Sequence, residues 1–171
     1  MPDVHIRPAS SDDIDDIRAI GHTSWQSTYS GILPKDYIEE TLKFWWSAEA
    51  IRTAMHTPEN IMLVAEYDDM LVGMLSGSVL PDDEGAVVLH RVYVRPDYVG
   101  QGIGGQLWQA YLDQLDEAVT RIKTSVASHN TNAREFYQHI GFEEIGTQEV
   151  EEFGHHTMNT LLEMLVERED D

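Results

Sequence analysis

The sequence predicts an α/β (α+β) protein with a mixed, mostly antiparallel seven-stranded sheet flanked by about four helices. Short runs rich in Val, Ile, Leu and Tyr recur along the chain and have the length of strands. Between some of these runs, apolar residues return every three or four positions, which is typical of amphipathic helices. Clusters of Gly, Pro and Asp separate the segments and supply turns. The predicted order is β-α-α-β-β-β-α-β-α-β-β.

The N-terminal part predicts one strand followed by helices. Residues 4–9 form the predicted first strand, and Ser10 or Ser11 can cap a helix whose isoleucines recur at helical spacing over 14–20. Four aspartates lie near the positive end of this helix, where carboxylates are favourable. The remaining segments of this part are an aromatic, turn-rich stretch over 25–34 and helical patterns over 35–42 and 47–56.

The rest of the chain begins with an antiparallel meander. Its predicted strands are 61–67, 71–80 and 86–94, with turns supplied by Asp68-Asp69 and by 81–85. The later predicted segments are a helix over 103–115, a strand over 121–127, a helix over 130–140 that stops at Gly141, and a hairpin of 142–151 and 155–166 around 152–154. By propensity alone, residues 161–166 also fit a helix.

Length and composition exclude several classes of protein. A chain of 171 residues fits a single domain over 1–171, and 42% hydrophobic residues can bury a core, which excludes general disorder. The net charge of -20 disfavours binding to nucleic acid or to an anionic membrane. Because the chain has no cysteine, disulfides, a thiolate nucleophile and Cys-ligated zinc are excluded.

Metal binding and export are also not expected. The adjacent His155 and His156 would point to opposite faces of one strand, so we predict no metal site. The first residues lack the basic-then-apolar pattern of a signal peptide, and no apolar stretch is long enough to cross a bilayer. The expectation is a cytoplasmic protein.

A glycine-rich turn is the most informative segment. Residues 89–105 read LHRVYVRPDYVGQGIGG, so a strand ends at Pro96 and four glycines precede an amphipathic helix. Glycines let the backbone approach a ligand closely, and the N–H groups and dipole at a helix start hold phosphate. A Rossmann motif does not fit, because the turn follows antiparallel-type strands, and a P-loop would need Gly-Lys-Ser/Thr.

A second motif lies one strand later, where residues 130–142 read N-x-x-A-x-x-F-Y-x-x-x-G-F. Together with VYVRPDYVGQGIG, this pattern strongly resembles the GCN5-related N-acetyltransferase (GNAT) superfamily. The opening IRPA, the W-x-x-x-Y-x-G-I-L-P stretch and the order of elements are also similar to that family, so the resemblance spans nearly the whole chain. It implies a GNAT fold with acetyl-CoA as co-substrate.

The resemblance also implies how acetyl-CoA would be bound. Backbone groups of Val92 and Val94 would bind the pantetheine arm, and the N–H of Val92 would polarise the thioester carbonyl. The N–H groups over 99–105 would take the pyrophosphate, Asn130 would bond the pantetheine, and Ala133 would leave space beside it. The complete implied set is Val92, Tyr93, Val94, Val99, Gly100, Gln101, Gly102, Ile103, Gly104, Gly105, Asn130, Ala133 and Tyr137. Val99 departs from the family pattern, which usually has Arg or Gln there, so a charged contact to phosphate is lost.

Two residues are candidates for the chemistry. Tyr137 would stand near the sulfur and, as a phenol, could protonate the departing thiolate; the alternative is a core aromatic beside Phe136. Histidine as a residue type titrates in the right range for a general base, so His90 is a candidate base for the acceptor amine; the alternative is a histidine packed in the sheet. Glu84 and Glu66 are further candidates, each more typical of a solvated carboxylate.

The resemblance implies an acceptor site built from the loop around the first helices and from the last hairpin. We take Trp25, Tyr29 and Glu84 as candidate substrate residues, since aromatic rings with nearby carboxylates suit a cationic amine. Other aromatic and histidine side chains of these segments more often belong to a core or surface: Trp45, Trp46, Phe153, His155 and His156.

The predicted function is acetyl-CoA-dependent transfer of an acetyl group directly to a primary amine of a small molecule, a polyamine or a peptide. The alternative is a non-catalytic acyl-CoA sensor with a GNAT fold. The aromatic segment over 25–46 also allows a homodimer. The identity of the acceptor stays open, because specificity lies in the segments with the least pattern.

The carboxylates indicate adaptation to high salt. They occur largely as adjacent pairs, and the chain has only three lysines, Lys35, Lys43 and Lys123. Screening shortens to roughly 3 Å at 1 M salt, so repulsion fades while hydrated carboxylates keep the protein soluble. The alternative is an ordinary acidic protein.

Adaptation to salt predicts that the melting temperature rises with KCl into the molar range, because screening removes repulsion among the carboxylates. Thermal unfolding followed by circular dichroism between low salt and 2 M KCl measures this. A melting temperature that stays flat or falls would contradict it.

Overall fold

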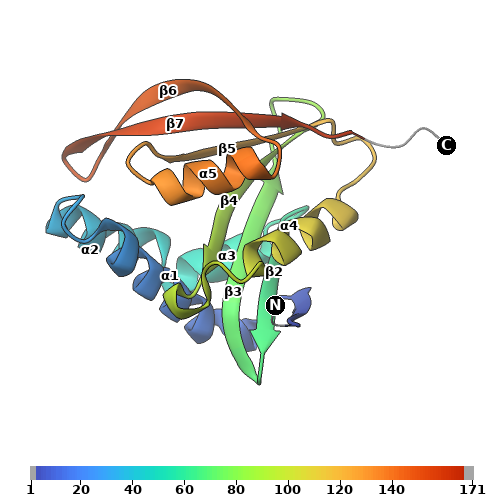
Figure 1. Ribbon diagram of the computed structural model, residues 1–171, viewed down its shortest axis with the longest axis horizontal. Helices are drawn as coiled ribbons and strands as arrows, with labels where there is room; N and C mark the ends of the chain where they lie inside the picture. The colour runs from blue at the N-terminus through green and yellow to red at the C-terminus, as the bar shows by residue number, and fades with distance from the viewer. Residues whose placement is uncertain (1–2, 168–171) are drawn as a thin grey trace. The chain divides into compact units, whose positions relative to one another are not determined.

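The computed structural model describes residues 3–167 of the chain, as a mixed α/β fold with a seven-stranded sheet in the order β1-β2-β3-β4-β5-β7-β6 (Figure 1). The strands are β1 (His5–Pro8), β2 (Ile61–Tyr67), β3 (Met70–Val79), β4 (Ala86–Val94), β5 (Arg121–Ala127), β6 (Glu143–Glu152) and β7 (His155–Leu165). The α-helices are α1 (Ile14–Tyr29), α2 (Lys35–Trp45), α3 (Ala48–His56), α4 (Ile103–Gln114) and α5 (Thr131–His139). Short 3-10 turns are η1 (Ser11–Asp13) and η2 (Pro96–Tyr98).

The predicted fold class is confirmed, but the helices match only roughly. Over 3–167 there are five α-helices, and three of them lie between β1 and β2 where the predicted order has two. All three match helical patterns of the sequence, over 14–20, 35–42 and 47–56, and the last of them starts at Ser47, whose hydroxyl accepts a hydrogen bond from Ala50 N–H at 3.0 Å. This cap separates α3 from α2.

The chain divides into two compact units. The first contains residues 3–77 and 91–114, and the second contains residues 78–90 and 115–167. Strands β3 and β4 contribute residues to both units.

The first unit contains the antiparallel strands β1, β2 and β3 with helices α1 to α4. Glycines allow two of its close contacts. A Cβ on Gly21 of α1 would lie within 2.4 Å of ring atoms of Trp46, and a Cβ on Gly73 of β3 would lie 3.1 Å from Leu107 of α4. The position of α4, which follows the glycine turn, therefore depends on a residue without a side chain in β3.

Helix α1 is longer than predicted. Residues 25–29, predicted as part of a turn-rich stretch, continue the helix to Tyr29. Ser, Thr and aromatic residues have only middling helix propensity, but Ser24 and Tyr29 are buried, so tertiary packing decides here. Helix α2 likewise runs three residues beyond the predicted 35–42, to Trp45.

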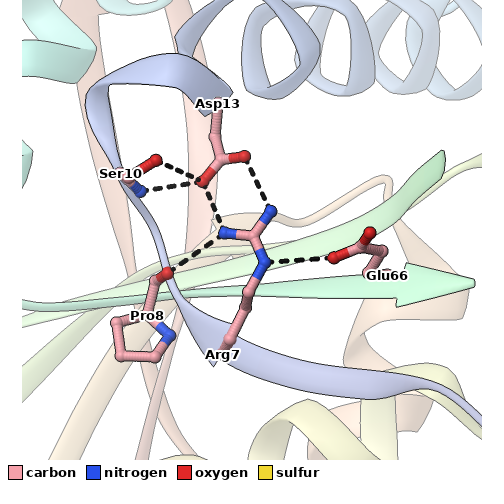
Figure 2. Close-up of polar contacts among 5 residues, drawn as sticks. All are labelled: Arg7, Pro8, Ser10, Asp13 and Glu66. Carbon is pink, nitrogen blue, oxygen red and sulfur yellow. Dashed lines mark hydrogen bonds and ion pairs between the residues drawn. The ribbon is translucent and has the colours of Figure 1, made fainter. Parts of the chain in front are cut away.

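An arginine in β1 ties the start of the first unit together (Figure 2). The guanidinium of Arg7 donates to both carboxylate oxygens of Asp13, at 2.8 and 2.9 Å, and to Glu66 of β2 at 3.1 Å. Asp13 also accepts from the backbone N–H of Ser10 at 2.8 Å. The two adjacent aspartates Asp12 and Asp13 thus differ, because Asp13 is buried and ion-paired while Asp12 is exposed.

The second unit contains β5, β7 and β6 in antiparallel array, with α5 beside them (Figure 1). The N-terminal part of β4 pairs with β5 in parallel, so the sheet is mixed as predicted. Phe153 and Gly154, both with positive φ, form the turn between β6 and β7. Residues 161–165 belong to a strand, so the hairpin prediction is confirmed over the helical alternative.

Replacing Asp13 by asparagine is expected to cost about 2 kcal/mol of stability at pH 7, because it leaves Arg7 without its buried counter-charge. Arg7 lowers the pKa of Asp13, so this contribution is complete above the unfolded pKa of about 3.9 and disappears as the pH falls through the folded pKa. The difference between wild type and Asp13→Asn in urea unfolding should therefore shrink below about pH 4.

Glu39→Gln is the matched control, since Glu39 pairs with Lys35 at 3.9 Å on an exposed helix surface. That change should alter stability by less than about 0.5 kcal/mol. Equal effects of the two substitutions would show that the buried ion pair contributes nothing specific.

Candidate functional site

The glycine turn before α4 leaves backbone N–H groups outside regular structure. Gly100 and Gly102 have φ of 85° and 83°, a conformation that glycine adopts without strain. The first helical hydrogen bond runs from Gln106 N–H to Gly102 O at 3.1 Å, so the N–H groups of residues 103–105 have no intrahelical acceptor. A Cβ on Gly100 or Gly105 would meet no atom within 4 Å. The turn therefore offers donors and open space together, which is what a phosphate group requires.

The other residues of this segment differ in how far they are exposed. Ile103 is buried and anchors α4, while Val99 is 63% exposed. Gln101 lies in the turn, with its amide 3.5 Å from the carbonyl oxygen of Asp97. The exposed Val99 supplies neither a charge nor a side-chain hydrogen-bond donor to this turn, so the donors that it presents are backbone N–H groups.

The end of β4 leads directly into this turn. Arg95 N–H donates to Val72 O at 2.8 Å, which holds the strand end against β3. The carbonyl of Val94 accepts from the hydroxyl of Ser24 at 3.5 Å. Val92 is half-buried in the strand. Val92 and Val94 thus lie in the same compact unit as the turn.

The two predicted aromatic acceptor residues lie together, and Tyr93 joins them. The rings of Trp25 and Tyr29 on α1 are 4.5 Å apart between centroids. The indole N–H of Trp25 donates to the hydroxyl of Tyr93 at 3.1 Å, and the ring of Tyr93 meets Trp46 edge-on at 5.0 Å. Burial raises the pKa of Tyr93. The side chain of Tyr93 therefore belongs to an aromatic cluster with Trp25 and Tyr29 of α1 and with Trp46, the residue that follows α2.

Arg91 is a residue of this cluster that sequence reasoning missed. Its guanidinium carbon lies 5.1 Å from the ring centroid of Trp46, and its Nη2 donates to the carbonyl of Trp45 at 2.9 Å. Burial lowers the pKa of Arg91. The sequence holds one signal that could have found Arg91. Residues 91 and 93 lie two positions apart in a predicted strand, so their side chains are expected on the same face of β4.

The second unit holds the candidate base. His90 is exposed on β4, and its Nε2 lies 2.6 Å from the hydroxyl of Ser78. Glu84 is exposed in the turn before β4, and its backbone carbonyl accepts from Arg121 at 3.3 Å. The neighbouring Asp83 bonds Arg121 and Lys123, which lower its pKa to about 2. These contacts order the turn that carries Glu84.

The second motif forms the start of α5. The side-chain oxygen of Asn130 accepts from Ala133 N–H at 3.1 Å and caps the helix. Tyr137 is 6% exposed, with its ring 5.5 Å from Phe136 and 5.3 Å from Phe142 between centroids. The motif residues thus have local packing and capping roles in addition to those that the resemblance implies.

Several weaker candidates lie in other surroundings. Glu66 pairs with Arg7, Trp46 is 2% exposed in the core, and His156 binds Glu149 at 2.7 Å on the surface. Among residues 3–167, no three His, Cys, Asp or Glu side chains are grouped to hold a metal ion. Within the same range, no helix has the length and apolar content needed to span a membrane.

Comparison with known proteins identifies the family. The profile of the acetyltransferase (GNAT) domain matches residues 26–162. A spermidine N(1)-acetyltransferase from Thermoplasma acidophilum is 24% identical over 144 residues, covering 81% of this chain and 88% of that protein.

Solved structures show the same fold. The PaiA N-acetyltransferase of Thermoplasma acidophilum in complex with coenzyme A has a TM-score of 0.80 at 21% identity, covering 96% of this chain and 99% of that one. A GCN5-related N-acetyltransferase from Rhodopseudomonas palustris has a TM-score of 0.78 at 21% identity, covering 97% and 98%. The chain belongs to the GNAT acetyltransferase family and is an enzyme that transfers acyl groups.

Proposed function

We propose that this enzyme, a single GNAT domain over 1–171, transfers an acetyl group from acetyl-CoA directly to a primary amine. The glycine turn before α4 carries the proposal, because its backbone donors and open space suit the pyrophosphate of coenzyme A. The related fold of the Thermoplasma protein solved with coenzyme A supports this choice of ligand.

Backbone recognition of the anion fits the charge of the chain. With a net charge of -20, the protein repels a free phosphate at long range in low salt. The N–H groups over 99–105 and the positive end of α4 act at short range, where they are less affected by screening. We assign the pyrophosphate to this turn: Val99, Gly100, Gln101, Gly102, Ile103, Gly104 and Gly105.

The pantetheine arm is assigned to β4 and to the start of α5. Over the described residues, the parallel ladder between β4 and β5 includes only 86–88 and 121–123, so later residues of β4 are not part of it. Their backbone groups on this edge can bond an extended ligand, and we assign Val92 and Val94 to that role. Since Asn130 uses its side-chain oxygen as a cap, its amide N–H group is the donor assigned to pantetheine.

The chemistry needs a neutral amine and a proton for the leaving thiolate. The amine nitrogen attacks the thioester carbonyl carbon, the carbon–sulfur bond breaks, and the amine loses a proton. A primary amine has a pKa of about 10.4, so a base speeds the reaction at neutral pH. We assign the base to His90 and the acid that protonates the thiolate to Tyr137.

The acceptor is proposed to be a primary amine of a small molecule. The Thermoplasma acidophilum relative is named for acetylation of spermidine, which supports an amine acceptor here. Trp25 and Tyr29, which are brought together on α1, are the proposed substrate residues from the first helices, with Glu84 as a further candidate. A homodimer remains a prediction from the sequence.

Gly105→Val is expected to weaken acetyl-CoA binding about 100-fold, because a side chain would occupy the space assigned to the pyrophosphate. A Cβ on Gly105 meets no protein atom, so the fold should persist. Isothermal titration calorimetry with acetyl-CoA measures the loss. Gly146→Val in β6, which is equally open, is the control and should leave affinity unchanged. Unchanged affinity in Gly105→Val would remove the turn from the coenzyme site.

Tyr137→Phe is expected to lower kcat about 100-fold while acetyl-CoA binds as before, since only the proton donor is lost. The ring contacts with Phe136 and Phe142 remain, so packing should persist. Steady-state kinetics with an amine acceptor in high KCl measures the effect. Tyr111→Phe, a buried tyrosine of α4, is the matched control and should retain kcat. Full activity of Tyr137→Phe would reject the acid assignment.

A further inference from the structure

Arg91 is a half-buried cation that no carboxylate of residues 3–167 neutralises. Its one hydrogen bond within residues 3–167 goes to the Trp45 carbonyl, at 2.9 Å, and its guanidinium carbon lies over Trp46. By contrast, Arg7, Arg121 and Arg134 all form ion pairs with carboxylates. Within the described residues Arg91 has no ion pair; it shares this with Arg18 and Arg95, which bond the backbone carbonyls of Trp46 and Leu71, but Arg91 also lies over an aromatic ring.

Such an arrangement is costly unless an anion arrives from outside. Taking a charge out of water without a partner opposes folding, and the lowered pKa of Arg91 reflects that cost. Of its five N–H donors, one is used by the Trp45 carbonyl. The others retain the planar fork that matches a carboxylate.

Tyr93 adds a second unused donor beside it. The hydroxyl oxygen of Tyr93 accepts from Trp25 at 3.1 Å, which leaves its own O–H to donate elsewhere. Over 3–167, this O–H has no acceptor. Arg91 and Tyr93 flank Val92, whose backbone is assigned to the thioester, so both donors belong to the strand segment where transfer would occur.

We propose that Arg91 and Tyr93 bind a carboxylate of the acceptor, so that the substrate is an amine that also carries a carboxylate, as an amino acid does. This inference rests on the proposed function. The unused donors of Arg91 and Tyr93 favour a substrate with an anionic group at this position. The fixed positive charge of Arg91 disfavours a polycation such as spermidine at the same position.

A purely structural role for Arg91 makes a different prediction. Its bond to Trp45 O at the C-terminal end of α2 has a close parallel, because Arg18 Nε donates to the next carbonyl, Trp46 O, also at 2.9 Å. Cations at a helix C-terminus stabilise the helix. Arg18→Gln is therefore a matched control that removes the same kind of cap without touching Arg91.

The experiment compares matched acceptors in high KCl with acetyl-CoA, measuring kcat and KM: phenylalanine with phenethylamine, lysine with cadaverine, and spermidine. Wild type should prefer the carboxylate-bearing member of each pair by about 10-fold or more in kcat/KM. Arg91→Gln should abolish this preference mainly by raising KM, Arg91→Lys should keep part of it, and Arg18→Gln should retain it. Tyr93→Phe should reduce the preference several-fold.

Binding of a carboxylate that cannot be acetylated tests this inference independently of the proposed acetyl transfer. Calorimetry with CoA present and with propanoate or 3-phenylpropanoate, which have no amine, should show binding that Arg91→Gln abolishes. If no amine is acetylated but this binding holds, the proposed function fails and the carboxylate site stands. Faster acetylation of spermidine or cadaverine than of carboxylate-bearing amines would overturn the inference. Equal effects of Arg91→Gln and Arg18→Gln on stability, with unchanged selectivity, would assign Arg91 to the helix cap instead.

Discussion

The backbone of the turn between β4 and α4 is the constraint on which the proposed chemistry depends. Two glycines with positive φ lie in this turn, and the first N–H groups of α4 have no acceptor within the helix. The helix can lie in this position because Gly73 leaves room for Leu107. A side chain at Gly73 would displace α4 and the donors together. The small size of Gly73 in β3 therefore sets the position of the proposed coenzyme site, although no residue of β3 is assigned a contact with the coenzyme.

The placement of the few cations is the second constraint. The chain has 11 basic residues against 31 acidic ones, so each arginine could find a carboxylate. Arg7 does so in a buried cluster that joins β1, η1 and β2, and Arg121 does so beside Asp83. Arg91 instead lies among aromatic rings and a backbone carbonyl. This difference is the basis for proposing that Arg91 is available to a ligand.

Local sequence patterns predicted much of the fold, but they did not predict contacts between residues that are far apart in the chain. Strands β4 and β5 match the predicted 86–94 and 121–127 to the residue, because β-branched runs bounded by Gly, Pro and Asp are local features. The extension of α1 through residues 25–29 depends on burial of Tyr29, and the burial of Asp13 depends on an arginine in another strand. In the site, the glycine turn was readable from the sequence. The contacts of Tyr93 with Trp25 and of Arg91 with Trp46 join residues far apart in the chain, so no sequence pattern indicates them.

Transfer of the acetyl group is the most direct measurement of the proposed activity. The protein is incubated in molar KCl with acetyl-CoA and a panel of amines, and both free CoA and acetylated amine are quantified. An N-acetyltransferase releases one CoA for each acetylated amine formed, and release depends on the amine. Binding of acetyl-CoA without amine-dependent CoA release across the panel would contradict the proposed activity and favour a sensor of acyl-CoA.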